Sequence, residues 1–151
     1  MKDIELDALF WNVNWTETPL DEFKTKILNS LSSAKGFVIH GNYNKIRDVT
    51  WKNSEIILWL DYPKYLVMWR VLKRSVSRIL CSEELWAGNK ESLQKTFLSK
   101  KSIILWAWNT YDLRKSQYTK LIAEPEYNHI KVLRFTSQKD LDYFLVEQGL
   151  I

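Results

Sequence analysis

The chain has 151 residues, of which 46% are apolar and 14% aromatic, enough for one packed core and too few for two ordinary domains. Only four glycines and three prolines occur, without low-complexity stretches or internal repeats, so the composition argues against disorder. The formal charge of +4 is only mildly basic, which is compatible with a nucleotide phosphate, with nucleic acid or with no specific anionic partner.

Apolar runs rich in β-branched residues predict short strands at residues 37–39, 56–60 and 130–135, with a weaker one at 4–6. Helices are predicted between them. Thr18 before Pro19, with Asp21 completing a capping box, predicts a helix over about 19–33. The remaining helices are predicted at about 64–80 after Pro63, 83–98, 102–122, and from the cap Ser137 to Gly149.

This order of elements, with a continuous apolar strand at 56–60, is typical of the α/β class. It predicts a three-layer α/β/α sandwich whose mostly parallel sheet is covered on both faces. Ligands bind beyond the carboxyl ends of such strands, which here are Asp7, residues 40–43 and residues 61–63. We expect functional residues at these positions.

The N-terminus and the single cysteine indicate the compartment. Acidic residues occupy the place where a signal peptide has basic ones, and no apolar run approaches the ~18 residues of a membrane span. Cys81 follows an apolar run and is expected to be a buried thiol in a reducing environment. We therefore predict a soluble, cytoplasmic protein with no membrane partner.

Two glycines imitate a phosphate-binding loop. Gly36 and Gly41 have Walker A spacing, but Asn42 and Tyr43 follow where Lys and Ser or Thr would contact phosphate and Mg²⁺. His40 has only His129 as a histidine companion and no Cys or carboxylate at ligand spacing. A structural histidine is favoured, and no metal site is predicted.

Basic residues concentrate between residues 64 and 82, where five Lys or Arg and no acid occur. Arg70, Arg74 and Arg78 are spaced four residues apart and lie on one stripe of the predicted helix. A solvated helix face and an arginine clamp for phosphate both fit this stripe, and the solvated face is the more common.

Eight tryptophans are present, more than a core of this size needs. Trp69 beside Arg70, and Trp106 and Trp108 before Arg114, have a setting in which nucleic-acid bases could stack. Their helical spacing favours buried packing, with Trp86 and Trp108 in the core or lining a groove. A non-enzymatic nucleic-acid-binding module using the basic helix 64–78 and the aromatics stays open as an alternative function.

Several weak motifs together cover nearly the whole chain. They are residues 4–11 (IELDALFW), Gly41-Asn42-Tyr43, Arg47-Asp48, Leu60-Asp61-Tyr62-Pro63, the arginine-rich helix, ELW at 84–86 and GNKE at 88–91. In this combination the chain resembles the adenylate-kinase-like P-loop NTPase family of the topology modulation protein type. The resemblance implies a nucleoside-phosphate kinase-like fold, ATP and Mg²⁺ as cofactors, and phosphoryl transfer to a small acceptor in full-length relatives.

The resemblance also implies roles for individual residues. The implied substrate-binding residues are Asp7, Trp11, Asn42, Tyr43 and Arg47, the last meeting an acceptor phosphate. A helical lid at about 64–98 would close on the donor phosphates. Its catalytic arginines are Arg70, Arg74 and Arg78, with Arg114 as a second clamp; such residues position and neutralise phosphates during transfer.

Two departures from the family pattern limit the expected activity. Family members begin with a strand, Walker A loop and helix before the segment that matches Ile4, and this sequence starts at Met1 without them. His40 stands where the family has an Asp that serves Mg²⁺, and imidazole suits this hard cation poorly. We expect a single, truncated or degenerate kinase-like domain over residues 1–151. It should be inactive alone, bind neither ATP nor Mg²⁺ tightly, and still accept a nucleotide or small phosphorylated partner.

The missing strand is central in the family's sheet, between the strands at 37–40 and 56–60. Its absence leaves two unpaired edges or forces these strands together. We therefore expect the chain either to re-pair these strands or to self-associate.

Overall fold

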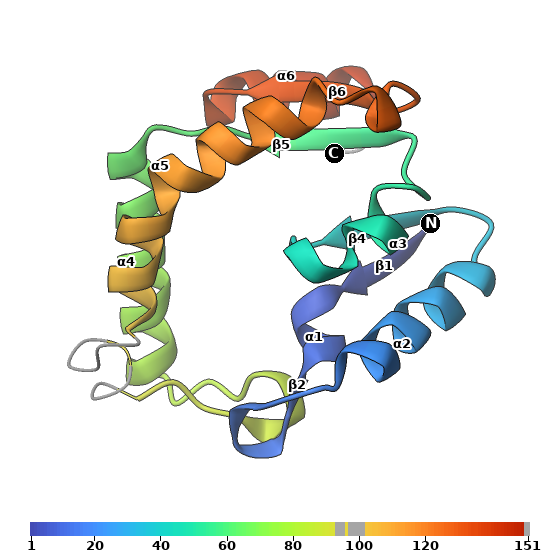
Figure 1. Cartoon of the computed structure of the whole chain (residues 1–151). Coiled ribbons are helices and arrows are strands. Elements are labelled where there is room, and N and C mark those ends of the chain that lie inside the picture. The colour runs from blue at the N-terminus through green and yellow to red at the C-terminus, as the bar shows by residue number, and fades with distance from the viewer. Residues whose placement is uncertain (93–95, 97–101, 150–151) are drawn as a thin grey trace. The chain divides into compact units, whose positions relative to one another are not determined.

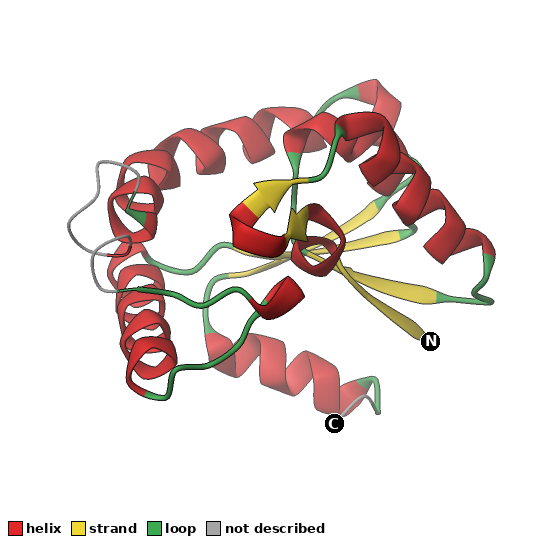
Figure 2. Ribbon diagram, turned by 90° about the horizontal axis from the view of Figure 1, so that it is seen from below, coloured by secondary structure: helices red, strands yellow, loops and turns green. Residues whose placement is uncertain are grey.

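The computed structural model of the chain describes residues 1–92, 96 and 102–149 (Figure 1). Two compact units divide the chain. Unit 1 comprises Met1–Ser54 and Glu83–Lys90, and unit 2 comprises Glu55–Ser82 and Glu91–Ile151. Helices and short parallel strands alternate along the chain (Figure 2), which confirms the α/β class. The expectation of one domain stays a prediction.

Unit 1 is built on the parallel pair of β1 (Lys2–Glu5) and β4 (Phe37–His40), with Ile4 opposite Ile39. Its helices are α1 (Leu6–Phe10), α2 (Leu20–Ser32) and α3 (Arg47–Thr50). Phe23 and Ile27 of α2 are buried because four-residue spacing places them on one face. They form the core of unit 1 together with Leu6, Ile46 and Val49.

Two irregular segments complete unit 1. The first, residues 11–17, contains β2 (Trp11–Asn12) paired antiparallel with β3 (Thr16–Glu17), and a 3-10 turn, η1 (Val13–Trp15), between them. The second, residues 83–90, contains the turn η3 (Trp86–Gly88) and contacts the first. Another turn, η2 (Asn44–Ile46), precedes α3.

Unit 2 is built on the parallel pair of β5 (Ile56–Leu60) and β6 (Lys131–Phe135). Its helices are α4 (Lys64–Leu80), α5 (Ile103–Ile122) and α6 (Gln138–Glu147), with the turn η5 (Pro125–Tyr127) before β6. Helices α4 and α5 pack against each other, and Figure 1 shows them in green and orange.

Helices contact both faces of the β5–β6 pair. Trp59 of β5 packs on Tyr118 of α5 at 6.1 Å between ring centroids, and Phe135 of β6 packs on Phe144 of α6 at 5.4 Å. Leu60 is opposite Phe135 in the register, so Phe135 and Trp59 point to opposite faces. Helix α5 therefore covers one face and α6 the other.

Most of the long elements match the sequence-based prediction. The strands at 37–39, 56–60 and 130–135 and the helices at 64–80 and 102–122 are confirmed within one or two residues. The Ser137 cap is also confirmed, because its hydroxyl oxygen accepts a hydrogen bond from the Asp140 N–H at 3.2 Å.

The predicted cap of α2 is wrong. Pro19 occupies the N-cap position and makes no side-chain cap. The Thr18 hydroxyl donates to the Leu9 carbonyl at 3.1 Å and accepts from the Asn12 amide at 3.0 Å. Thr18 is buried, so its hydroxyl ties the 11–17 segment to α1, a tertiary contact that the local sequence does not reveal.

The predicted helix over 83–98 is also wrong in its described part. Residues 83–90 form a reversal closed by a bridge between Glu84 and Lys90. Ala87 and Gly88 have φ of 54° and 72°, a left-handed conformation that a right-handed helix does not contain. Of the remaining residues of this prediction, 93–95, 97 and 98 lie outside the described part of the chain.

The predicted burial of Cys81 is wrong as well. Cys81 is exposed, because it follows the last turn of α4. Trp108 is 54% exposed and thus outside the core; its alternative place, lining a groove, stays a prediction. Among the described residues, no helix is both long enough and apolar enough to cross a membrane.

The two parallel pairs are separate two-stranded sheets. Among the described strands, β4 pairs with β1 and β5 pairs with β6. The re-pairing of β4 with β5 that the sequence suggested is therefore not found there. Self-association stays a prediction.

Candidate functional site

The carboxyl ends of β1 and β4 bring two predicted site residues together. Asp7 lies in the first turn of α1, directly after β1, and Tyr43 follows β4. The Tyr43 hydroxyl donates a hydrogen bond to Asp7 Oδ1. Gly41 makes this approach possible: its φ is +106°, and a Cβ there would lie 3.2 Å from the Leu6 Cβ.

Burial raises the pKa of the Tyr43 hydroxyl well above its usual range, and the hydrogen bond and charge of Asp7 raise it further. The ring of Tyr43 packs against Phe10 and Phe23, with centroids at 4.7 and 5.4 Å. Tyr43 is therefore a fixed, protonated donor that orients the Asp7 carboxylate.

The other predicted substrate-binding residues also lie in unit 1. Arg47 donates to Asn44 Oδ1 at 2.5 Å, and its guanidinium lies 5.5 Å from the centroid of the Trp51 ring. Trp11 packs edge-on against Phe10 at 4.8 Å and against Trp15 at 5.5 Å. Asn42 is half-buried between Gly41 and Tyr43.

His40 contacts a carboxylate of the neighbouring strand. Its Nε2 lies 2.9 Å from Asp3 Oδ1 on the neighbouring strand, and both side chains are more than half exposed. An exposed imidazole engaged by a carboxylate does not match the oxygen ligands that Mg²⁺ requires. Within the described residues, no group of three or more His, Cys, Asp or Glu is arranged to hold a metal ion.

The predicted arginines lie in unit 2 with different surroundings. Arg70 donates to Gln138 Oε1 at 2.9 Å and lies 4.7 Å from the centroid of the Tyr62 ring. Arg78 is ion-paired with Glu91 at 3.2 Å, and both side chains are mostly buried. The guanidinium of Arg114 covers Trp106 at 4.5 Å. Arg74 is exposed on α4. Arg70, Arg74 and Arg78 thus lie on one helix, but their side chains do not converge on a common site.

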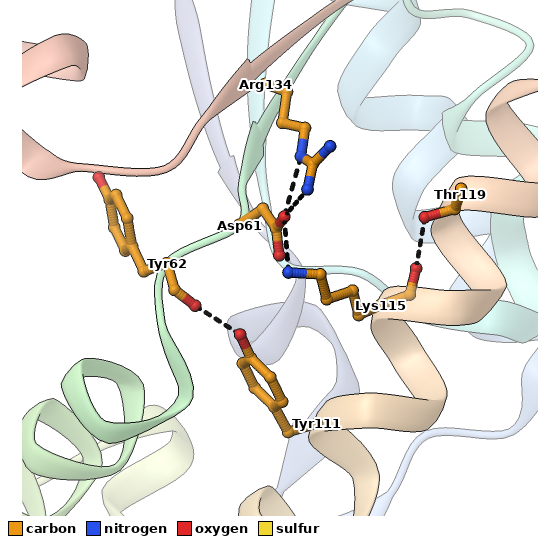
Figure 3. A network of polar contacts seen from close by, with 6 residues as sticks. All are labelled: Asp61, Tyr62, Tyr111, Lys115, Thr119 and Arg134. Carbon is orange, nitrogen blue, oxygen red and sulfur yellow. Dashed lines mark hydrogen bonds and ion pairs between the residues drawn. The ribbon is translucent and has the colours of Figure 1, made fainter.

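A further charged cluster lies at the carboxyl end of β5 (Figure 3). Asp61 follows β5 with 3% of its side chain exposed, and Arg134 Nε donates to its Oδ2 at 2.9 Å. Lys115 of α5 places Nζ 3.1 Å from the same oxygen. Beside it, the Tyr111 hydroxyl donates to the Tyr62 carbonyl at 2.7 Å and fixes the turn into α4.

Sequence reasoning pointed to the position of Asp61 at a strand end but missed Lys115 and Arg134. Arg134 carried a usable signal, because it is a charge between Leu133 and Phe135 in an apolar strand. Lys115 carried none, since lysines on helices are ordinarily solvated.

Comparisons of the chain with protein-family models, with curated proteins and with solved structures found no match.

Proposed function

We propose that this chain binds a small phosphorylated molecule, such as a nucleoside phosphate, as a P-loop kinase-like protein of the adenylate-kinase-like, topology modulation type. The proposal includes the three-layer sandwich of that family. The observation that supports it best is the contact of Asp7 with Tyr43 beyond the carboxyl ends of the parallel strands β1 and β4. These are residues that the resemblance implies for the acceptor, and such strand ends are where ligands bind in α/β folds.

The side chains have complementary roles in this proposal. The Asp7 carboxylate, oriented by Tyr43, accepts a hydrogen bond from a hydroxyl group of the bound small molecule. Arg47 supplies the positive charge and planar donors that a phosphate requires. Trp11 offers an aromatic surface to the rest of the acceptor.

The proposal is limited to binding. The sequence contains no Walker A motif, and the imidazole of His40 is a poor ligand for Mg²⁺, so the proposal includes no phosphoryl transfer. In an assay of ATP-dependent phosphoryl transfer we expect negligible turnover. Ordinary turnover that is abolished by Arg70→Ala or Arg74→Ala would contradict this limit.

The test of acceptor binding is a titration with AMP, followed by tryptophan fluorescence and calorimetry at constant ionic strength. Arg47→Gln should weaken binding by about tenfold or more, because a charge-assisted contact to phosphate is lost. Asp7→Asn should weaken it less, because the amide oxygen still accepts a hydrogen bond.

Lys45→Gln is the matched control, because Lys45 is an exposed cation two residues from Arg47. It should leave the affinity unchanged. The proposed function is wrong if AMP and other nucleoside phosphates do not bind saturably. It is also wrong if Arg47→Gln and Lys45→Gln change the affinity for AMP equally.

A second candidate function is binding of single-stranded nucleic acid. It is favoured by exposed tryptophans on α4 and α5: Trp69 is 60% exposed, and Trp108 has the Lys64 ammonium over its ring at 4.3 Å. Bases stack on such rings while cations neutralise the backbone. Steeply salt-dependent binding of oligonucleotides, with tryptophan quenching and no AMP binding, would favour this function.

A further inference from the structure

Unit 2 contains a group of three charged side chains, Asp61, Lys115 and Arg134, which we call the Asp61 cluster. Its members come from three elements: the end of β5, helix α5 and strand β6. It shares no residue with the acceptor residues of unit 1, and an inference from it does not depend on the proposed function.

The Asp61 cluster has one positive charge in excess. Both cations contact the same carboxylate oxygen, Oδ2 of Asp61. Among the described residues, no other carboxylate lies within ion-pair distance of Lys115 or Arg134. One carboxylate balances one cation, so the cluster as a whole carries a net charge of +1.

The negative charge of the cluster is buried, and its two positive charges are partly exposed. The Asp61 side chain is 3% exposed, whereas Arg134 is 49% and Lys115 43% exposed. The negative charge is thus withdrawn from solvent and the two positive charges are presented to it. An anion in solution can therefore contact the two cations without contacting the carboxylate.

The Asp61 carboxylate also fixes the direction of the arginine. Arg134 uses Nε and Nη2 on Asp61, and its guanidinium lies 4.8 Å from the centroid of the Trp59 ring. Within the described part of the chain, Nη1 makes no hydrogen bond. Its protons and those of Lys115 Nζ that do not face Asp61 remain as donors. Because Asp61 already orders the side chains of Arg134 and Lys115, they lose less conformational entropy when a ligand binds.

We propose that the Asp61 cluster is a binding site for a phosphate group of a small molecule. Arg134 and Lys115 bind the phosphate oxygens through charge-assisted hydrogen bonds. Asp61 is a positioning residue that orients both cations and does not touch the anion.

The experiment is calorimetric titration of the intact chain with inorganic phosphate at constant ionic strength. We expect saturable binding that weakens by about tenfold in Arg134→Gln and in Lys115→Gln, since each removes one charge-assisted contact. Arg134→Lys should give an intermediate loss, because it keeps the charge but loses the planar donors.

Lys120→Gln is the matched control: it removes the same charge from an exposed position on the same helix as Lys115. It should bind phosphate as the unmodified chain does. Circular dichroism establishes that each variant is folded, and if Arg134→Gln is not, the comparison of Lys115→Gln with Lys120→Gln decides. Equal weakening in these two variants, or no saturable binding by the unmodified chain, would overturn the proposal.

Parallel titrations with AMP and adenosine identify the source of the phosphate. AMP binding tighter than inorganic phosphate, lost in Lys115→Gln but retained in Arg47→Gln, would assign a nucleotide phosphate to this site. Equal affinity for AMP and phosphate would assign free phosphate. Tight binding of adenosine that is insensitive to Lys115→Gln would contradict a phosphate site.

Discussion

Asn89 connects two segments of unit 1 through its side-chain amide. Its Oδ1 accepts a hydrogen bond from the Trp15 N–H at 2.9 Å, and its Nδ2 donates to the carbonyls of Asn12 and Trp86, both at 2.8 Å. Asn89 is 5% exposed. These bonds satisfy backbone groups of residues 11–17 and 83–90 and tie the two segments together.

Asn89→Ala should therefore lower the free energy of unfolding by roughly 1–3 kcal/mol, since the Trp15 N–H and the Asn12 carbonyl lose these hydrogen bonds while staying partly buried. Urea denaturation followed by tryptophan fluorescence measures this change. Asn128→Ala removes the same side chain from an exposed position and should change stability little. Equal effects of the two substitutions would show that the Asn89 bonds do not stabilise unit 1.

The raised pKa of Tyr43 links stability to alkaline pH. In the unfolded chain this hydroxyl ionises near its usual pKa of 10.0, whereas in the folded chain it keeps its proton to higher pH. Above pH 10.0 the folded state therefore binds more protons than the unfolded state. The stabilisation from Tyr43 is fully present below the unfolded-state pKa of 10.0 and is lost as the pH rises towards the folded-state pKa.

Tyr43→Phe should accordingly make the fall in unfolding free energy between about pH 10 and 11 less steep. Denaturation at a series of pH values measures the slope, with Tyr65→Phe as the exposed-tyrosine control. A slope in Tyr43→Phe that equals the slope of the unmodified chain would contradict the link.

At the scale of elements, α6 depends on its N-terminal cap. Helix α6 has 10 residues, too few for stability in isolation. Ser137→Ala removes the hydrogen bond to the Asp140 N–H and should cost about 1 kcal/mol of stability. Thermal unfolding compared with Thr136→Ala, a neighbouring exposed hydroxyl, tests this, and equal melting temperatures would contradict a capping role.

The elements that could be predicted from the sequence are those with a strong local signal. Strand β5 is a continuous apolar run and α4 follows a proline, and the predicted bounds of both elements agree with the structure. The Ser137 cap has the local pattern of a helix start. In each case the information lies within a few neighbouring residues.

The elements that could not be predicted depend on distant residues. Segment 83–90 reads as a helix start, but it is held in a reversal by bonds from Asn89 to residues 12 and 15. Thr18 reads as a cap, but its hydroxyl reaches Leu9. For the candidate site, the contact of Asp7 with Tyr43 follows from two strand ends that the sequence identified. The Asp61 cluster needs the register of β6 against β5, which the sequence does not specify.

At the scale of the whole molecule, we predict association between copies from the separate strand pairs. Two-stranded sheets are marginal alone, and β5 contains no charged residue that would discourage pairing at its edge. We predict that the apparent size in size-exclusion chromatography rises with protein concentration.

Leu58→Lys should reduce this association by placing a charge on β5, whereas Leu113→Lys, on exposed α5 surface, should not. Circular dichroism verifies that both variants keep their helices. A compact monomer with one cooperative melting transition at every concentration would contradict self-association.

The division of the chain into units has a consequence for biosynthesis. Unit 1 receives its last segment, residues 83–90, only after β5 and α4 of unit 2 have been made. Strand β5 in turn waits for β6, which follows more than 70 residues later. Chains that fold during synthesis ordinarily complete one unit before the next emerges from the ribosome. Here neither unit is finished in that order, so Trp15 and the apolar residues of β5 remain without their partners while the nascent chain lengthens.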